Sequence, residues 1–230
     1  MTDRPIAKKA RSVESAALAG IVYAILAFTA LTLLTRLPSL SLSSEEIAAW
    51  YQDAANRTPV VIGLNLAAIS SVAFLWFVAV IRRRVGDRED RFFATVFLGS
   101  GILYVGMWLV AATLLAATAV APDLFAGAEV DKASHTLMAG TAGGLLLVAG
   151  PRVQAVFVLT TSTLILRTGV MPKWLAYFGY VMGLALFVTP LIIQPIGLGF
   201  PAWVLIVSVT ILFSRNAALS NGAGAGTQSD

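Results

Sequence analysis

Arg152 is the residue best placed to do chemistry, because it is a single cation inside a long apolar stretch. Residues 133–151 before it and 153–166 after it contain no Asp, Glu, Lys or Arg. A cation inside a bilayer is costly unless it reaches the interface, meets a carboxylate or faces a hydrated cavity. Counting back from Arg167 places Arg152 about 21 Å above the cytoplasmic end, in the outer third of a hydrocarbon layer about 30 Å thick.

The partner of Arg152 decides whether this arginine is structural or functional. No Asp or Glu lies inside a predicted span, so a counter-charge must come from the outer connection, a lipid phosphate or an anionic ligand. The candidate ion-pair partners are Asp131, Glu129 and Asp123. An ion pair or lipid contact would make Arg152 structural, whereas anion recognition would place it in a binding site.

Pro151 and Gln154 lie beside Arg152 and complete this candidate anion or lipid contact. The pair Gly150-Pro151 can open the helix and free backbone groups near the charge, as in the ion and substrate sites of transporters. The same pair can also simply kink a long helix. Both interpretations predict an interruption near residues 150–152.

Catalytic and metal-binding side chains are scarce. The chain has no cysteine and one histidine, His135, which excludes thiolate metal sites, a catalytic thiol and a haem held by two of its own histidines. Gly99-Ser100-Gly101 holds a serine, but a serine nucleophile needs a histidine facing it inside the bilayer, and we place His135 in or near an outer loop. We therefore expect no enzymatic activity, cofactor or metal.

Membrane helices are the elements that position these residues. Hydrophobic residues make up 58% of the 230 residues and charged residues only 12%, a balance that a soluble core cannot absorb. A span needs about 20 apolar residues. We predict an all-α, polytopic transmembrane helical bundle with one domain, 1–214, and six spans. The spans are 15–35, 59–81, 92–120, 136–166 (interrupted near 150–152), 174–190 and 198–214.

Glycine and proline mark the ends of the later spans. Gly169 can end the helix of the fourth span and Pro172 can begin the next helix. The last spans form a hairpin, because Pro190, Pro195 and Pro201 interrupt the apolar run in its middle. Residues 215–230 lack large apolar side chains and predict a disordered cytoplasmic tail.

Basic residues set the orientation, because cytoplasmic segments retain Lys and Arg. With both termini in the cytoplasm, only Arg36, Arg57 and Lys132 lie outside. The cytoplasmic residues are Arg4, Lys8, Lys9, Arg11, Arg82, Arg83, Arg84, Arg88, Arg91, Arg167, Lys173 and Arg215. The basic residues therefore reflect membrane topology, and we expect no nucleic-acid partner.

A short extracytoplasmic helix is predicted on the membrane surface between the first two spans. Ser43 and Glu46 have the spacing of a capping box. Ile47, Trp50 and Tyr51 then recur on one helical face. An aromatic and apolar underside is typical of helices that lie in the interface.

Small residues predict where helices approach closely. Gly140 and Gly144 form one pair four residues apart, and Gly179 and Gly183 form another. Such spacing lets helix backbones pack together in membranes, within one chain or between copies.

Three segments resemble a family of small actinobacterial polytopic membrane proteins, related to a broader bacterial membrane family known only as a domain of unknown function. The segments are PRVQAVFVLTTST from Pro151, LRTGVMPKWLA from Leu166 and FPAWVLIVS from Phe200. The resemblance covers chiefly 145–214. It implies a bacterial cytoplasmic membrane, about six spans and Arg152 within a recurring segment, and it brings no activity.

The expected function is that of a non-enzymatic component that binds membrane lipids or joins an assembly, either a homo-oligomer or a larger membrane complex. The lack of a charged transport pathway favours this interpretation. The alternative is a small transporter or channel for an anionic or amphipathic compound, with Arg152 as the recognition charge.

Overall fold

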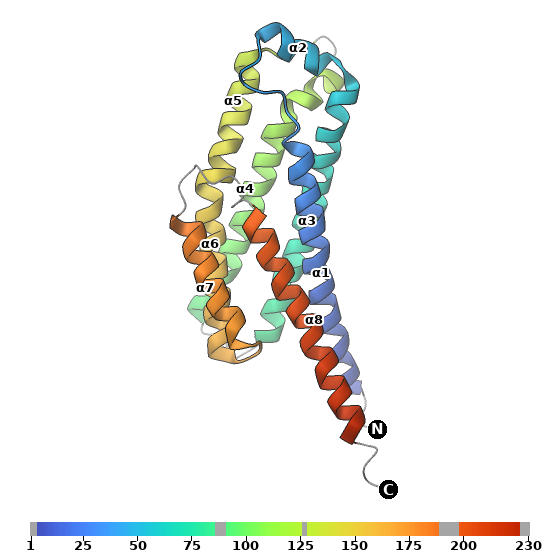
Figure 1. Cartoon of the computed structure of the whole chain (residues 1–230), viewed down its shortest axis with the longest axis vertical. Helices are drawn as coiled ribbons and strands as arrows, with labels where there is room; N and C mark the ends of the chain where they lie inside the picture. The colour runs from blue at the N-terminus through green and yellow to red at the C-terminus, as the bar shows by residue number, and fades with distance from the viewer. Residues whose placement is uncertain (1–3, 86–90, 126–127, 189–197, 226–230) are drawn as a thin grey trace.

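The computed structural model describes residues 4–85, 91–125, 128–188 and 198–225, and over these residues the chain contains helices and no strand (Figure 1). The all-α prediction is therefore confirmed for this part of the chain. The helices are α1 (Arg4–Leu34), α2 (Ser44–Gln52), α3 (Ala54–Val85), α4 (Arg91–Leu124), α5 (Lys132–Gly143), the π-helix η2 (Gly144–Ala149), α6 (Gly150–Thr168), α7 (Lys173–Val188) and α8 (Gly199–Ala225).

Four helical segments of the described chain are long and apolar enough to cross a membrane: Ala17–Leu34, Ala54–Arg83, Arg91–Leu124 and Lys132–Thr168. The apolar helices Lys173–Val188 and Gly199–Phe213 are shorter. Large apolar side chains are exposed on all of these segments, which suits contact with lipid. Examples are Leu18, Ile25, Ile69, Trp76, Ile102, Val110, Leu137, Val181, Leu184 and Phe213.

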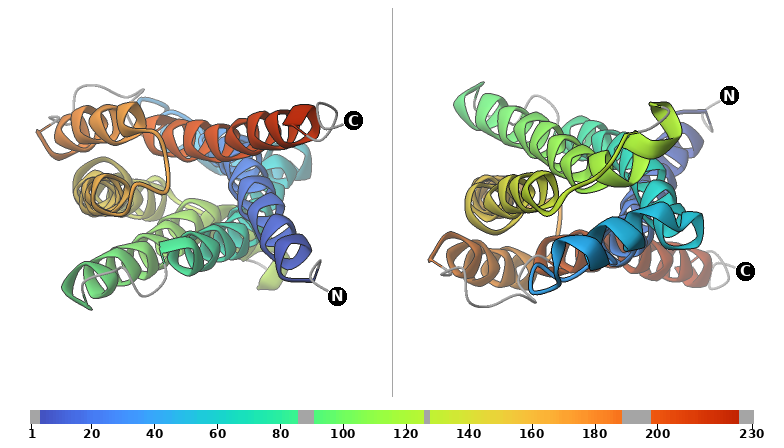
Figure 2. Two further views of the ribbon diagram at one scale, coloured as in Figure 1. Left: turned by 90° about the horizontal axis from the view of Figure 1, so that it is seen from below. Right: turned by 90° about the horizontal axis from the view of Figure 1, so that it is seen from above.

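The helices form an elongated bundle. Helix α1 packs against α3 and α8, and α4 packs against α3 and α6. Viewed along the long axis, α6 lies between α4 and α7 (Figure 2). The start of α1 and the end of α8 share one end of the molecule, and α2 lies across the other end (Figure 1).

One aromatic core joins five of these helices. Tyr104 of α4 and Phe200 of α8 have ring centroids 4.7 Å apart, and Phe97 stacks on Phe157 of α6 at 4.8 Å. The hydroxyls of Tyr23 and Tyr104 share a buried hydrogen bond of 2.6 Å. The other members are Phe74, Phe77 and Trp203. Edge-to-face and tilted contacts of this kind add to the stability that burial alone gives.

Two predicted helix boundaries are confirmed by hydrogen bonds and backbone angles. The Ser43 hydroxyl accepts from the N–H of Glu46 at 3.2 Å, while the Glu46 carboxylate accepts from the N–H of Ser43 at 2.8 Å, which completes the capping box. Gly169 ends α6 with φ of 64°, a left-handed conformation that glycine adopts without strain.

Part of the predicted tail, residues 215–225, belongs to helix α8. Helix α8 continues through Ala225, well beyond the predicted boundary at residue 214. The segment 215–225 contains no proline and includes Ala217, Ala218 and Leu219, which favour continuation of a helix. Residues 226–230 lie outside the described residues.

The interruption predicted at 150–152 begins earlier, as the π-helix η2. Its wider turn lets the N–H of Gly150 reach the carbonyl of Leu145, five residues back. Pro151 has no N–H and its ring would press on the carbonyl four residues before it, so a regular α-helix is disfavoured here. A Cβ on Gly150 would lie 2.7 Å from the Leu145 oxygen, so the π turn requires glycine at this position.

Gly150→Ala is expected to lower the free energy of unfolding by about 1–3 kcal/mol, because the new methyl group would press on the Leu145 carbonyl. The measurement is SDS-induced unfolding in mixed detergent micelles. Gly140→Ala is the matched control, because a Cβ there meets open space. It should be neutral or stabilising by up to about 1 kcal/mol. Equal effects of the two substitutions would contradict this account.

Candidate functional site

Arg152 is half-buried near the middle of the continuous helical segment Lys132–Thr168. Its Nη1 donates to the carbonyl oxygen of Val148, one turn earlier in η2. The guanidinium therefore satisfies a backbone acceptor within the irregular turn. This contact is local and requires no partner from another helix.

The predicted ion pair between Arg152 and the outer carboxylates is not formed among the described residues. Asp123 pairs with Arg57, and Asp131 caps α5 by accepting from the N–H of Ser134 at 2.8 Å. Arg152 lies twenty-one residues beyond Asp131, which is about 30 Å along a helix. The side chains are therefore too far apart to meet.

Asp131 and Glu129 instead line an outer cavity of about 500 Å³ beneath α2. Hydrogen bonds from Ser134 hold the pKa of Asp131 below its ordinary value, so this carboxylate stays ionised as the cap of α5. Glu45 of α2 also lines the cavity, which makes the outer cavity acidic.

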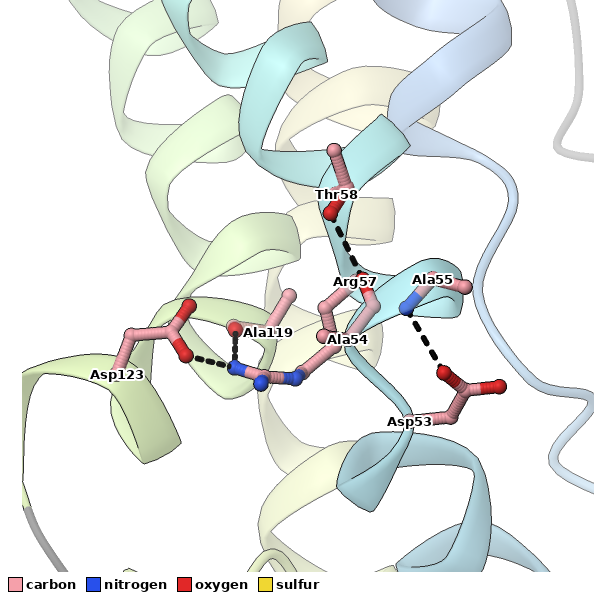
Figure 3. Close-up of polar contacts among 7 residues, drawn as sticks. All are labelled: Asp53, Ala54, Ala55, Arg57, Thr58, Ala119 and Asp123. Atoms are coloured by element: carbon pink, nitrogen blue, oxygen red, sulfur yellow. Dashed lines mark hydrogen bonds and ion pairs between the residues drawn. The ribbon is translucent and has the colours of Figure 1, made fainter.

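Arg57 is the buried cation that the sequence analysis assigned only to an outer loop. Figure 3 shows its side chain extending from α3 to the end of α4. Its Nη1 lies 2.5 Å from Asp123 Oδ1 and donates to the Ala119 carbonyl at 3.3 Å. The Arg57 side chain is only 9% exposed, whereas that of Asp123 is 59% exposed. The pair therefore joins a buried charge to one that remains hydrated.

His135 lies in α5 and is buried, although the sequence placed it in or near a loop. Its Nε2 is 3.0 Å from the carbonyl of Pro38, which can only accept, so Nε2 carries the proton. Nδ1 then accepts from the Tyr51 hydroxyl at 2.8 Å, and Tyr51 accepts from Thr118 at 2.8 Å. Burial raises the pKa of Tyr51 against the opposing effect of Thr118, which keeps the phenol protonated as a donor.

This hydrogen-bond network fixes α2 to α4 and α5. It also occupies both ring nitrogens of His135, so neither is free to accept a proton from a serine nucleophile. The hydroxyl of Ser100 donates to carbonyls of its own helix, those of Val96 and Phe97. The structure does not bring Ser100 and His135 together.

A second cavity, of about 410 Å³, lies inside the bundle between α1, α4, the η2 region and the start of α8. We call it the inner cavity. Its apolar lining residues are Ala27, Leu31, Leu115, Ala139, Gly143, Leu146, Leu147, Leu198 and Pro201. Its polar lining residues are Thr32, Thr35, Tyr104, Trp108 and Gln154. No acidic residue, Lys or Arg belongs to this lining within the described chain.

Four of the five polar lining residues already have hydrogen-bond partners. Thr32 and Thr35 donate to carbonyls one turn back in α1. Trp108 Nε1 donates to the Ser70 hydroxyl at 3.2 Å, and Tyr104 bonds to Tyr23 in the aromatic core. Each of these groups therefore already has a partner within the protein.

Gln154 is the exception. Its side chain is 8% exposed, and its buried Oε1 has no partner among the described residues. An unsatisfied buried polar group costs about 1–3 kcal/mol. Gln154 is close to Pro151 and Arg152 in the sequence, but of these three only Gln154 belongs to the lining of the inner cavity.

The two predicted glycine pairs have different surroundings. Gly179 of α7 packs against Ser162 and Trp203, and Gly183 packs against Leu159. A Cβ at Gly140 or Gly144 would meet open space. Gly20 packs closely against Ser208 of α8, a contact that the sequence analysis missed. The signal was present, because Gly20 and Ala24 are small residues four positions apart.

In comparisons with known proteins, no protein-family model, curated protein or solved structure matches the chain significantly.

Proposed function

We propose that this chain is a six-span protein of the cytoplasmic membrane that binds an amphipathic molecule in its inner cavity without changing it chemically. In this arrangement both termini face the cytoplasm. The support for the topology comes from charge. The end of α3, the start of α4 and the turn between α6 and α7 lie toward the end of the bundle where α1 begins (Figure 1). These segments carry Arg82, Arg83, Arg91, Arg167 and Lys173. That clustering is the pattern of cytoplasmic ends.

Helices α7 and α8 supply the fifth and sixth spans in this proposal. Helix α7 has 16 residues and is about 24 Å long, somewhat less than the hydrocarbon thickness. Membranes adjust to short spans by local thinning at modest cost. The exposed side chains of Tyr177, Val181 and Leu184 suit contact with lipid.

The inner cavity is the observation that carries the proposed function. Its walls come from apolar parts of membrane-spanning segments, so a molecule that occupies it enters from the bilayer more easily than from water. Its volume falls within the range of about 300–1,000 Å³ that is usual for small-molecule sites.

Transport of an anion is less well supported than binding. A path for an anion needs a cation along it, and Arg152 hydrogen-bonds within its own helix instead of lining the inner cavity. The remaining polar groups of the cavity are neutral.

The test is photolabelling in liposomes with hexadecyl methyl ether that carries a mid-chain diazirine. We expect labels on the α1, α4 and α5 residues that line the inner cavity. Ala139→Trp should fill the cavity and abolish these labels while leaving labels on the outer surface. Leu137→Trp, 64% exposed on the same helix, is the control and should label as the unmodified protein does. Absence of cavity labels in the unmodified protein would refute the proposal.

A further inference from the structure

We propose that the inner cavity selects an uncharged amphiphile whose head carries a hydroxyl group, and that Gln154 recognises this hydroxyl. This inference rests on the proposed function, because it assumes that the cavity binds an amphipathic molecule. It adds the chemical class of that molecule and the residue that selects it.

The lining excludes charged heads. A charge transferred to an apolar site without a partner is strongly disfavoured, and the described lining supplies no counter-ion. The polar groups contributed by α1 and α4 already bond to protein atoms. Gln154 is therefore the group left to bind a ligand head.

The position of Gln154 excludes a phospholipid head. Gln154 lies fourteen residues before Thr168 and twenty-two after Lys132, which is about 21 Å and 33 Å from the two ends of this helical segment. A phosphate held there would lie inside the hydrocarbon layer, beside a cavity lining that supplies no cation among the described residues. A small neutral head tolerates such depth when it is hydrogen-bonded.

The amide of Gln154 matches a hydroxyl better than other neutral heads. An amide offers an acceptor oxygen and a donor NH₂ group, and a hydroxyl both donates and accepts. The buried acceptor Oε1 has no partner in the described chain, so a ligand that donates as well as accepts satisfies this amide more completely than one that only accepts. An ether, ester or ketone only accepts and would leave Oε1 unsatisfied.

A comparison of two photolabelling probes, in liposomes with the full-length protein, tests this inference. The probes are two diazirine-labelled chains of equal length, 1-hexadecanol and its methyl ether. We expect the alcohol to label the cavity residues of the unmodified protein at least about tenfold more efficiently. Gln154→Met should remove this preference while ether labelling persists. Thr29→Val, whose native hydroxyl bonds to its own helix and does not line the cavity, should retain the preference.

The outcomes separate the two proposals. Equal labelling by alcohol and ether in the unmodified protein overturns the hydroxyl inference and leaves the cavity as a binding site. A preference that survives in Gln154→Met overturns the role of Gln154. Cavity residues that neither probe labels overturn the proposed function itself.

Discussion

Gly179→Ala is expected to destabilise the protein by about 2–3 kcal/mol, because α6 and α7 meet at this glycine with no room for a methyl group. The added Cβ would overlap the hydroxyl oxygen of Ser162 and lie 3.3 Å from Trp203 Nε1. Ser162 is fully buried and its hydroxyl is bonded to the Val158 carbonyl at 2.8 Å, so it cannot turn away without losing that bond. The free energy of unfolding by SDS in mixed micelles measures the loss.

A second substitution separates steric overlap from other effects of alanine. Ser162→Ala removes the overlapping oxygen, so the double variant Ser162→Ala/Gly179→Ala should recover most of the lost stability. Gly106→Ala in α4 is the matched control, because a Cβ there meets nothing within 4 Å. Additive losses in the double variant would show that the close approach of α6 and α7 is not the cause.

Asp123→Ala is expected to cost about 2–3 kcal/mol, because it leaves the buried guanidinium of Arg57 with the Ala119 carbonyl alone. Arg57→Met should cost less than half as much. It fills a similar volume and leaves behind a carboxylate that is already mostly hydrated. The asymmetry follows from the unequal burial of the two charges. Thermal and SDS unfolding of both variants measure it.

The double variant Arg57→Met/Asp123→Ala is the decisive control for this pair. Its stability should lie close to that of Arg57→Met, because the carboxylate has no buried charge left to neutralise. If Asp123→Ala is harmless by itself, the ion pair shown in Figure 3 contributes nothing to the fixation of α3 against α4.

Features that depend on residues close together in the chain were predictable from the sequence. The helices long and apolar enough to cross a membrane follow from long apolar runs. The capping box and Gly169 follow from residue types at fixed spacing. The structure separates Gln154 from Arg152, because only Gln154 lines the inner cavity. Residues two apart on a helix face different sides, so neighbours in sequence do not share a site.

Features that depend on packing were not predictable. The Arg57–Asp123 pair joins residues 66 positions apart. It could not be predicted because hydropathy does not indicate which helices pack together. The inner cavity is likewise a property of several helices together. Among the described lining residues, Gln154 is identified as unsatisfied only when the hydrogen-bond partners of its polar neighbours are known.

The π-helix η2 sets the rotational phase between the two halves of the segment Lys132–Thr168. Each residue of an α-helix advances the direction of its side chain by about 100°, and a wider turn resets that advance. His135, which precedes η2, faces Tyr51. Gln154, which follows η2, lines the inner cavity. The number of residues in Gly144–Ala149, more than their identity, therefore fixes the direction of His135 relative to that of Gln154. A single insertion or deletion there would turn either His135 away from Tyr51 or Gln154 away from the inner cavity.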